Sequence, residues 1–254
     1  MTGPRTTTGT GAQGRSATND DHRPETGCPR GALLLVRHGE TEWTLNRRHT
    51  SITDVPLTAR GEQQAMQLAM PLRGLDIARV LTSPRTRATH TARLAGLPNP
   101  QTCDDLREWD YGAYEGLRTA DILRRRPEWS LWRDGVPPGN DQPGESPDSV
   151  GARADRVLAS LRSDLDAAER LVVVVGHGHF LRVLAARWLG LPPTAGSLFR
   201  LDTATVSRLG VEHGRPVVAQ WNQSYGQAAE ARPGEKGWSP GMKVPRSHAG
   251  TNQG

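Results

Sequence analysis

Leu33-Leu-Leu-Val-Arg-His-Gly-Glu40 joins a short apolar run to an arginine, a histidine and a glycine. The apolar part, Ala32–Val36, has the length and composition of a strand that is buried on both faces of a sheet. Two similar runs lie further along the chain, the valine-rich Leu171–Val175 and the weaker Val80–Thr82. These runs predict strands in the interior of a sheet.

Helical patterns follow the strands. After the weaker run, Ser83 and Pro84 predict an N-cap and a first helical residue for a helix through Arg85–Leu94. After the valine-rich run, Phe180–Trp188 has its apolar residues on one face. Two further helices are indicated by apolar residues at helical spacing: Ala65, Leu68, Ala69 and Leu72 after the cap residue Thr58, and Val150, Val157, Leu158, Leu161 and Leu165. Alternating strands and helices predict an α/β fold, a single-domain three-layer α/β/α sandwich with a mostly parallel central sheet.

The remaining segments set the predicted domain limits. Thr203–Val211 and Pro216–Trp221 predict a pair of strands around a His213-Gly214 turn. Gly135–Pro147 is rich in proline and glycine, and we interpret it as a loop within one domain. Residues 1–30 and 223–254 contain no apolar run, so we predict two disordered tails around a single domain over residues 31–222.

The composition excludes several classes of protein. The isoelectric point is 9.8 and the net charge is +5. Residues 1–30 carry +1 and residues 223–254 carry +2, however, so the 192 residues between them carry only +2. A nearly neutral domain lacks the basic surface of a nucleic-acid-binding protein. The longest aliphatic runs have about five residues, too few to cross a membrane, and no apolar signal segment begins the chain, so we predict a soluble, cytoplasmic protein.

Two pairs of residues stand at the ends of predicted strands. Arg37-His38 follows the first strand, and Gly176-His177 follows the valine-rich strand. Ligands of α/β sheets bind beyond the carboxyl ends of the strands. We therefore expect two histidines and an arginine to meet at one edge of the sheet and to form a site.

Such a site suits phosphoryl transfer. Neutral imidazole is a nucleophile that can form a covalent intermediate. Guanidinium groups bind phosphoryl oxygens through a bidentate fork. Expulsion of an alkoxide also requires a proton donor, usually a carboxylic acid. The predicted set is therefore two histidines, two or more arginines, and one glutamate or aspartate.

The motif around His38 is one of five blocks. The first is Arg37-His-Gly-Glu-Thr-Glu-Trp43. The others are Asp54-Val-Pro-Leu-Thr58 with Gly61-Glu-Gln-Gln-Ala65, Ser83-Pro84 with Arg87-Ala88 and Thr91-Ala92, Leu106-Arg-Glu-Trp-Asp-Tyr-Gly112 with Glu115-Gly116, and Val174-Val-Gly-His-Gly178 with Arg182. In this order they resemble the signature blocks of the histidine phosphatase superfamily, the phosphoglycerate-mutase-like group. The resemblance spans about residues 32–222 and implies the α/β fold of that family and a phosphoric monoester hydrolase.

The resemblance also implies a role for each matched residue. His38 would be the phosphorylated nucleophile, with Arg37 and Arg87 binding the phosphoryl oxygens. His177 would be the second imidazole of the pocket, and Glu108 the proton donor that later activates water. Substrate contacts are implied at Arg37, Thr44, Thr50, Arg87 and Gly178. The resemblance implies no metal and no cofactor. The expected partner is a small phosphate ester, with no nucleic acid and no membrane, and a homodimer is compatible with the resemblance.

Some positions depart from the common family pattern. Thr44 stands where asparagine is common, Ser51 where glycine is common, and Gly176 where serine is usual. Together with Glu108-Trp-Asp-Tyr-Gly112 and Gly176-His-Gly-His-Phe180, these departures resemble an acid-phosphatase branch of the family.

Other functions fit the same residues. A phosphoglycerate mutase shares the pocket, but the mutases that use bisphosphoglycerate usually carry a longer insertion than the 69 positions from Glu108 to His177. Without that insertion, water reaches the phosphohistidine, which favours hydrolysis. A sugar-bisphosphatase uses the same chemistry. A catalytically inactive module that binds phosphorylated ligands would tolerate loss of the nucleophile or the acid, whereas His38 and Glu108 are both present.

Several polar residues near the motifs have simpler interpretations. His177 and His179 have no third residue at a spacing that would complete a metal site, so we interpret His179 as packed or at the pocket rim. Glu115 is interpreted as a turn carboxylate rather than an alternative acid. His49 either reaches the substrate or simply lies on a loop.

Overall fold

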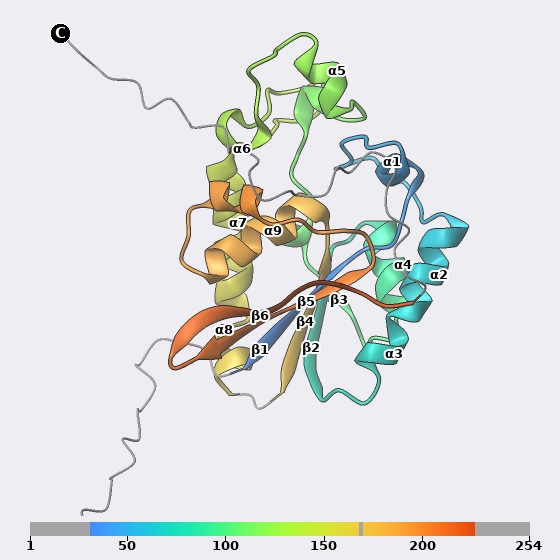
Figure 1. Cartoon of the computed structure of the whole chain (residues 1–254), viewed down its shortest axis with the longest axis vertical. Helices are drawn as coiled ribbons and strands as arrows, with labels where there is room; N and C mark the ends of the chain where they lie inside the picture. The colour runs from blue at the N-terminus through green and yellow to red at the C-terminus, as the bar shows by residue number, and fades with distance from the viewer. Residues whose placement is uncertain (1–30, 168–169, 227–254) are drawn as a thin grey trace, which may run out of the picture.

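The computed structural model describes residues 31–167 and 170–226, which form one six-stranded sheet with helices on both faces (Figure 1). The strands are β1 (Ala32–Arg37), β2 (Ile77–Thr82), β3 (Gln101–Thr102), β4 (Leu171–Gly176), β5 (Thr205–Glu212) and β6 (Arg215–Ser224). Their order in the sheet is β3-β2-β4-β1-β5-β6. The first four strands in this order are parallel, and β5 is antiparallel to both β1 and β6. The predicted α/β fold with a mostly parallel sheet is confirmed.

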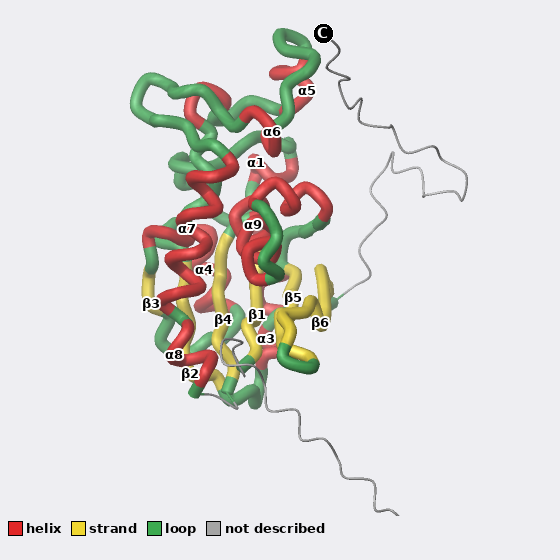
Figure 2. Tube along the Cα trace, turned by 90° about the vertical axis from the view of Figure 1, so that its left-hand side faces the viewer, coloured by secondary structure: helices red, strands yellow, loops and turns green. Residues whose placement is uncertain are grey.

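Two helical layers cover the sheet. On one face lie α7 (Pro147–Ser160), α8 (Arg162–Asp166) and α9 (Gly178–Trp188), and on the other lie α2 (Ala59–Gln67), α3 (Ala69–Leu72) and α4 (Thr86–Leu94). Figure 2 shows the first layer in front of the strands. Leu33 and Leu35 pack with this layer and Leu34 and Val36 with the other, because successive side chains of a strand point to opposite faces.

A lobe lies beyond the carboxyl ends of the parallel strands. It contains the short helices η1 (Asp104–Leu106), η2 (Gly112–Tyr114), α5 (Thr119–Leu123) and α6 (Leu131–Asp134). Figure 1 shows α5 and α6 above the sheet, with α1 (Glu42–Leu45) below them. Trp109 and Trp129 are buried inside the lobe, and Trp132 packs on the Trp109 ring. The lobe therefore has its own apolar contacts, and it carries Glu108 to the site from outside the sheet.

The predicted start of α4 is wrong. The helix begins at Thr86, and its N-cap residue is Arg85 rather than Ser83. Asp54, from a loop 32 residues earlier, accepts hydrogen bonds from the Thr86 N–H (2.9 Å) and the Thr86 hydroxyl. Because this distant carboxylate binds the first N–H group of the helix, the Ser83 hydroxyl is available to another side chain.

The other predicted elements match the structure within a few residues, except that two helices predicted as single are each divided, one into α2 and α3 and the other into α7 and α8. Thr58 caps α2, and its Oγ1 accepts a hydrogen bond from the Gly61 N–H at 3.0 Å. Of the residues predicted to point inward, Ala69 and Leu158 are only half-buried. β6 continues to Ser224, two residues past the predicted domain end at 222. The predicted tails over 1–30 and from 227 onward lie outside the described residues. Within those residues, every helix is too short or too polar to cross a bilayer.

Candidate active site

The carboxyl ends of β1 and β4 bring the two motif histidines together, as predicted. The strands pair in parallel with Arg37 opposite Gly176. The backbone N–H of His38 donates to the Gly176 carbonyl at 3.1 Å. The rings of His38 and His177 meet edge to face, with their centroids 5.1 Å apart.

His38 keeps one ring nitrogen available for chemistry. Its Nδ1 lies 2.7 Å from the Gly39 carbonyl oxygen. Because a carbonyl only accepts, Nδ1 carries the proton, and Nε2 keeps its lone pair. Burial lowers the pKa of His38 well below 6.5, and the charges of Arg87 and Arg37 lower it further. The side chain lines a cavity, so a neutral imidazole faces the space where a ligand would bind.

His177 is fixed from both sides of its ring. Arg87 donates from Nε to His177 Nδ1 at 3.3 Å. Nε2 of the neutral ring therefore carries the proton, and it donates to Ser83 Oγ at 2.7 Å. Burial lowers the pKa of His177 well below 6.5, and Arg87 adds to the effect. His177 and Arg87 are both fully buried and do not line the cavity, so a phosphoryl group must enter deeply beside His38 to touch them.

A carboxylate anchors the loop that holds Arg87. Arg87 donates from Nη1 to the Thr53 carbonyl (3.0 Å) and from Nη2 to the Ser51 carbonyl (3.1 Å). Glu115 accepts hydrogen bonds from the backbone N–H groups of Ser51 (2.9 Å) and Thr53 (3.0 Å), and from the Ser51 hydroxyl (2.7 Å). Glu115 is thus a loop-holding carboxylate, and the loop it holds orients Arg87.

The carboxyl group of Glu108 lies beside the first residues of α9 and lines the cavity. Oε1 accepts hydrogen bonds from the N–H groups of Trp109 (2.9 Å) and Phe180 (2.8 Å), and Oε2 accepts one from the His179 N–H (3.0 Å). The first N–H groups of a helix have no partner within the helix, so this carboxylate satisfies two of them. Oε2 receives a single hydrogen bond and retains the capacity to carry a proton.

Arg37 and Gly178 lie against each other at the cavity wall. A Cβ atom on Gly178 would stand 3.2 Å from Arg37 Cζ, so the glycine gives the guanidinium its room. Arg37 also donates from Nη1 to the Leu201 carbonyl. Both residues line the cavity beside His38, which leaves the predicted phosphate contact of Arg37 sterically open.

Thr44 and Thr50 line the cavity as well. The Thr44 hydroxyl donates to the Thr41 carbonyl (2.9 Å) and accepts from the Thr41 N–H (2.9 Å), closing a capping box at the start of α1. The Thr50 hydroxyl donates to the Arg48 carbonyl at 3.0 Å. Each hydroxyl has one hydrogen, which is already donated. The predicted substrate contacts therefore require these side chains either to rotate or to accept a hydrogen bond from the substrate.

His49 is buried and His179, on α9, is half-buried, and both line the cavity. His179 Nδ1 lies 2.6 Å from the Tyr111 hydroxyl oxygen. His49 Nε2 lies 3.3 Å from the Thr119 hydroxyl oxygen, and burial lowers the pKa of His49 to about 4. His177 and His179 have different partners, and among the described residues no group of three potential metal ligands occurs.

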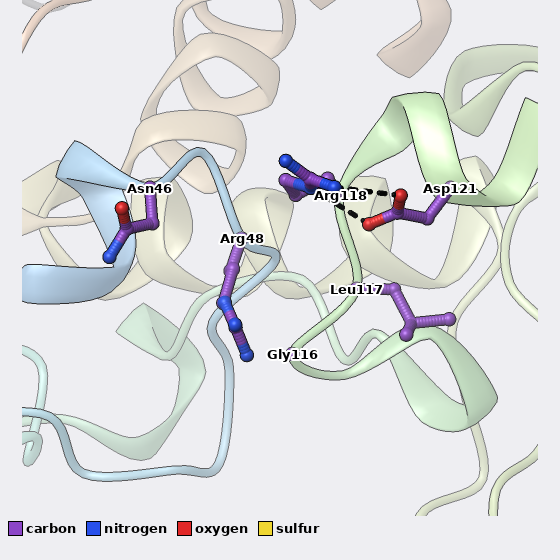
Figure 3. Close-up of a pocket in the computed structure, with 6 residues that line it drawn as sticks. All are labelled: Asn46, Arg48, Gly116, Leu117, Arg118 and Asp121. Carbon is purple, nitrogen blue, oxygen red and sulfur yellow. Dashed lines mark hydrogen bonds and ion pairs between the residues drawn. The ribbon is translucent and has the colours of Figure 1, made fainter.

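The cavity has a volume of about 1300 Å³, which is far larger than a phosphoryl group. Five arginines besides Arg37 line it: Arg47, Arg48, Arg60, Arg182 and Arg200. A smaller pocket of about 420 Å³ adjoins it, and Arg48 belongs to both. Figure 3 shows Arg118 paired with Asp121 on one side of that pocket and Arg48 beside Gly116. The acidic residues of the large cavity are Glu40, Glu108 and Asp202, so arginines outnumber carboxylates and its wall favours anionic ligands.

Sequence reasoning missed two contributors to the site. The sequence predicts a helix cap at Ser83, whereas the Ser83 hydroxyl lies 2.7 Å from His177 Nε2. Arg153 has no place in the five blocks, yet it is only 8% exposed and binds the segment that carries Glu108. A signal for Arg153 was present, because it lies on the buried face of α7 between Val150 and Val157.

The chain is similar to known phosphatases and mutases. The model of the family described as "Histidine phosphatase superfamily (branch 1)" matches residues 33–224. An acid phosphatase of Mycobacterium tuberculosis is 44% identical over 72% of this chain and 87% of its own length. A probable phosphoglycerate mutase, GpmB, of Salmonella choleraesuis is 36% identical over 74% of this chain and 89% of its own. A solved structure of the open reading frame Rv3214 from Mycobacterium tuberculosis superposes with a TM-score of 0.71 at 41% identity, covering 76% of this chain and 98% of that one.

Proposed function

The chain belongs to the histidine phosphatase superfamily, branch 1, and we propose that it hydrolyses small phosphomonoesters through a phosphohistidine at His38. The observation that carries this proposal is the state of His38. Its ring is neutral, its proton is held on Nδ1 by the Gly39 carbonyl, and Nε2 is available at the wall of an arginine-lined cavity. These are the properties of a nucleophile for a phosphoryl group.

In the first half of the proposed reaction, the lone pair of His38 Nε2 attacks phosphorus. The bond from phosphorus to the ester oxygen breaks, and its electron pair goes to the leaving oxygen. That oxygen takes the proton from the Glu108 carboxyl group and departs as a neutral alcohol. The positive charge on the phosphorylated ring is held by the hydrogen bond from Nδ1 to the Gly39 carbonyl. Arg37, with Arg87 deeper in the site, balances the charge on the equatorial oxygens.

In the second half, the Glu108 carboxylate removes a proton from water as the water oxygen attacks phosphorus. The bond from Nε2 to phosphorus breaks, and its electron pair returns to His38. Inorganic phosphate leaves, and Glu108 is again protonated for the next ester. The cavity is large enough to admit water beside the ring, which supports hydrolysis over return of the phosphoryl group to a bound acceptor.

The test combines product analysis with trapping of the intermediate. Wild type should release free phosphate from nitrophenyl phosphate, and acid-sensitive, alkali-stable phosphate should label His38. The His38→Ala variant should do neither. Conversion of 3-phosphoglycerate to its 2-isomer without release of phosphate would instead show a mutase. Equal inactivity of both proteins on sugar mono- and bisphosphates, nucleotides and phosphopeptides would favour a binding module.

A further inference from the structure

Arg153 uses every donor that it has within the protein. A guanidinium has five N–H groups and accepts nothing. Nε and Nη2 form a fork to Oε1 and Oε2 of Glu145, both at 2.7 Å. The side chains of this pair are only 10% and 15% exposed, and neither residue lines the large cavity. The pair therefore acts on the protein rather than on a ligand.

The remaining three donors of Arg153 hold the segment that leads to the acid. Nη1 donates to the carbonyls of Asp105 (2.7 Å) and Arg107 (2.9 Å), and Nη2 donates to the carbonyl of Glu108 itself (3.3 Å). The guanidinium also lies over the Phe180 ring, 4.9 Å from its centroid. Phe180 provides the backbone N–H that donates to Glu108 Oε1. Arg153 thus contacts both the backbone that carries the carboxyl group and the helix start that receives it.

Glu145 holds the same segment on its far side. Its Oε2 accepts a hydrogen bond from the Asp110 N–H at 2.8 Å. Its backbone carbonyl accepts one from Trp109 Nε1 at 3.0 Å, and its N–H donates to the Asp110 carbonyl at 3.1 Å. Through Glu145, the Pro- and Gly-rich loop is tied to Trp109 and Asp110, the two residues that follow Glu108.

We propose that the ion pair between Arg153 and Glu145 positions Glu108 for proton transfer to the leaving oxygen. This inference rests on the proposed function, because it assigns a support to the proton donor of that reaction. Glu108 does not directly follow a strand, because η1 separates it from β3, so strand pairing does not fix its position. A general acid acts only within hydrogen-bond reach of the oxygen it protonates, and a shift of about 1 Å can cost about a hundredfold in rate. Helix α7, packed on the sheet, provides the fixed reference through Arg153.

The dependence of rate on the leaving group distinguishes this role from a general structural one. A nitrophenolate leaves without a proton, whereas a simple alkoxide requires one. Displacement of Glu108 therefore slows alkyl phosphates far more than nitrophenyl phosphate. General loss of folded protein slows both equally, so the ratio of the two kcat/KM values is independent of the active fraction.

The experiment measures this ratio for Arg153→Lys, Glu145→Gln and Glu108→Gln. Lysine keeps the charge but cannot reproduce the fork to Glu145 together with the three bonds to backbone carbonyls. We expect the ratio of nitrophenyl to alkyl phosphate kcat/KM to rise about tenfold or more in Arg153→Lys and Glu145→Gln, and further in Glu108→Gln. Arg156→Lys is the matched control. It lies on the same helix and binds the Asp105 side chain, but its own side chain is 58% exposed, and its ratio should equal that of wild type.

The outcomes separate the two proposals. If Glu108→Gln raises the ratio and both pair variants leave it at the wild-type value, the positioning role is overturned while the proposed function stands. If Glu108→Gln leaves the ratio unchanged, Glu108 is not the proton donor, and the inference fails with that assignment. A variant that folds poorly still reports its ratio from the folded fraction, which thermal denaturation of the same sample quantifies.

Discussion

The two ends of the active site are built in different ways. At the phosphoryl end, His38 and His177 follow adjacent parallel strands, and main-chain pairing of those strands sets their separation. At the acid end, Glu108 comes from a lobe outside the sheet, and side chains of α7 and of a loop hold its backbone. The first end is an outcome of sheet topology, whereas the second depends on individual tertiary contacts.

Each end nevertheless relies on an arginine that is held by backbone carbonyls and supported by a carboxylate. Arg87 is bound by the loop that Glu115 anchors, and Arg153 is bound by the acid segment and paired with Glu145. Glu115 acts through Arg87 on the phosphoryl group, whereas Glu145 acts through Arg153 on the proton donor. A change at the phosphoryl end should therefore slow every ester, whereas a change at the acid end should act mainly on poor leaving groups.

Arg87→Lys should have the largest effect. A lysine cannot bond the loop carbonyls of Thr50, Ser51 and Thr53 and His177 Nδ1 at the same time, and it loses the planar charge near the phosphoryl oxygens. We expect kcat/KM to fall about 10²- to 10³-fold on aryl and alkyl phosphates alike. Steady-state kinetics on both ester classes provides the measurement. A fall restricted to alkyl phosphates would contradict the separation of the two ends.

Glu115→Gln should have the next largest effect. Glutamine keeps one acceptor oxygen for the loop, but its amide group would oppose the N–H or hydroxyl donors of Ser51. The loop carbonyls that bind Arg87 would shift, and we expect kcat/KM to fall about thirtyfold, equally for all esters.

Binding of orthovanadate, which resembles the transferring phosphoryl group, should weaken in parallel with kcat/KM in Glu115→Gln. Asp155→Asn, on α7, replaces an exposed carboxylate that pairs with Arg187 outside both pockets, and it should change neither quantity. Unchanged vanadate affinity in Glu115→Gln would show that this carboxylate supports the lobe alone.

The contrast between the ends also explains what the sequence could predict. The strands around Leu33 and Leu171 are continuous apolar runs, so their positions, and with them the meeting of His38 and His177, followed from local patterns. The identity of Glu108 as the candidate acid came from a resemblance rather than from periodicity. Burial of Arg153 follows from its position on α7, but its partner could not be predicted, because it binds the Glu108 carbonyl 45 positions away and every residue possesses such a carbonyl.

Ser83→Ala tests the residue for which the sequence interpretation was wrong. As a helix cap, Ser83 would contribute to stability only. As the acceptor for His177 Nε2, it fixes the second imidazole, and we expect its loss to lower kcat/KM about tenfold on all esters. Thr58→Ala, which removes the cap of α2, is the comparison variant. It should lower the free energy of unfolding by about 1 kcal/mol and leave the kcat/KM of the folded protein unchanged on all esters. A loss of stability in Ser83→Ala without a change in kcat/KM would restore the cap interpretation.

The smallest effect should appear in the pH dependence of stability at the acid end. Burial lowers the pKa of His49 to about 4, and the charge of Glu115 opposes this shift. At His38, in contrast, the charges of Arg87 and Arg37 lower the pKa in the same direction as burial does. The unfolded chain, in which a histidine titrates near 6.5, therefore binds more protons than the folded protein as the pH falls below that value. The stability from a neutral His49 is complete above about pH 7 and is lost on acidification. Between pH 7 and pH 6 this loss is about 0.7 kcal/mol for one histidine that stays neutral in the folded state.

Urea denaturation of His49→Gln at the two pH values should show a decrease in unfolding free energy that is smaller than in wild type by this amount. An identical decrease in both proteins would mean that His49 takes up its proton in the folded state, and that the lobe admits water to this ring.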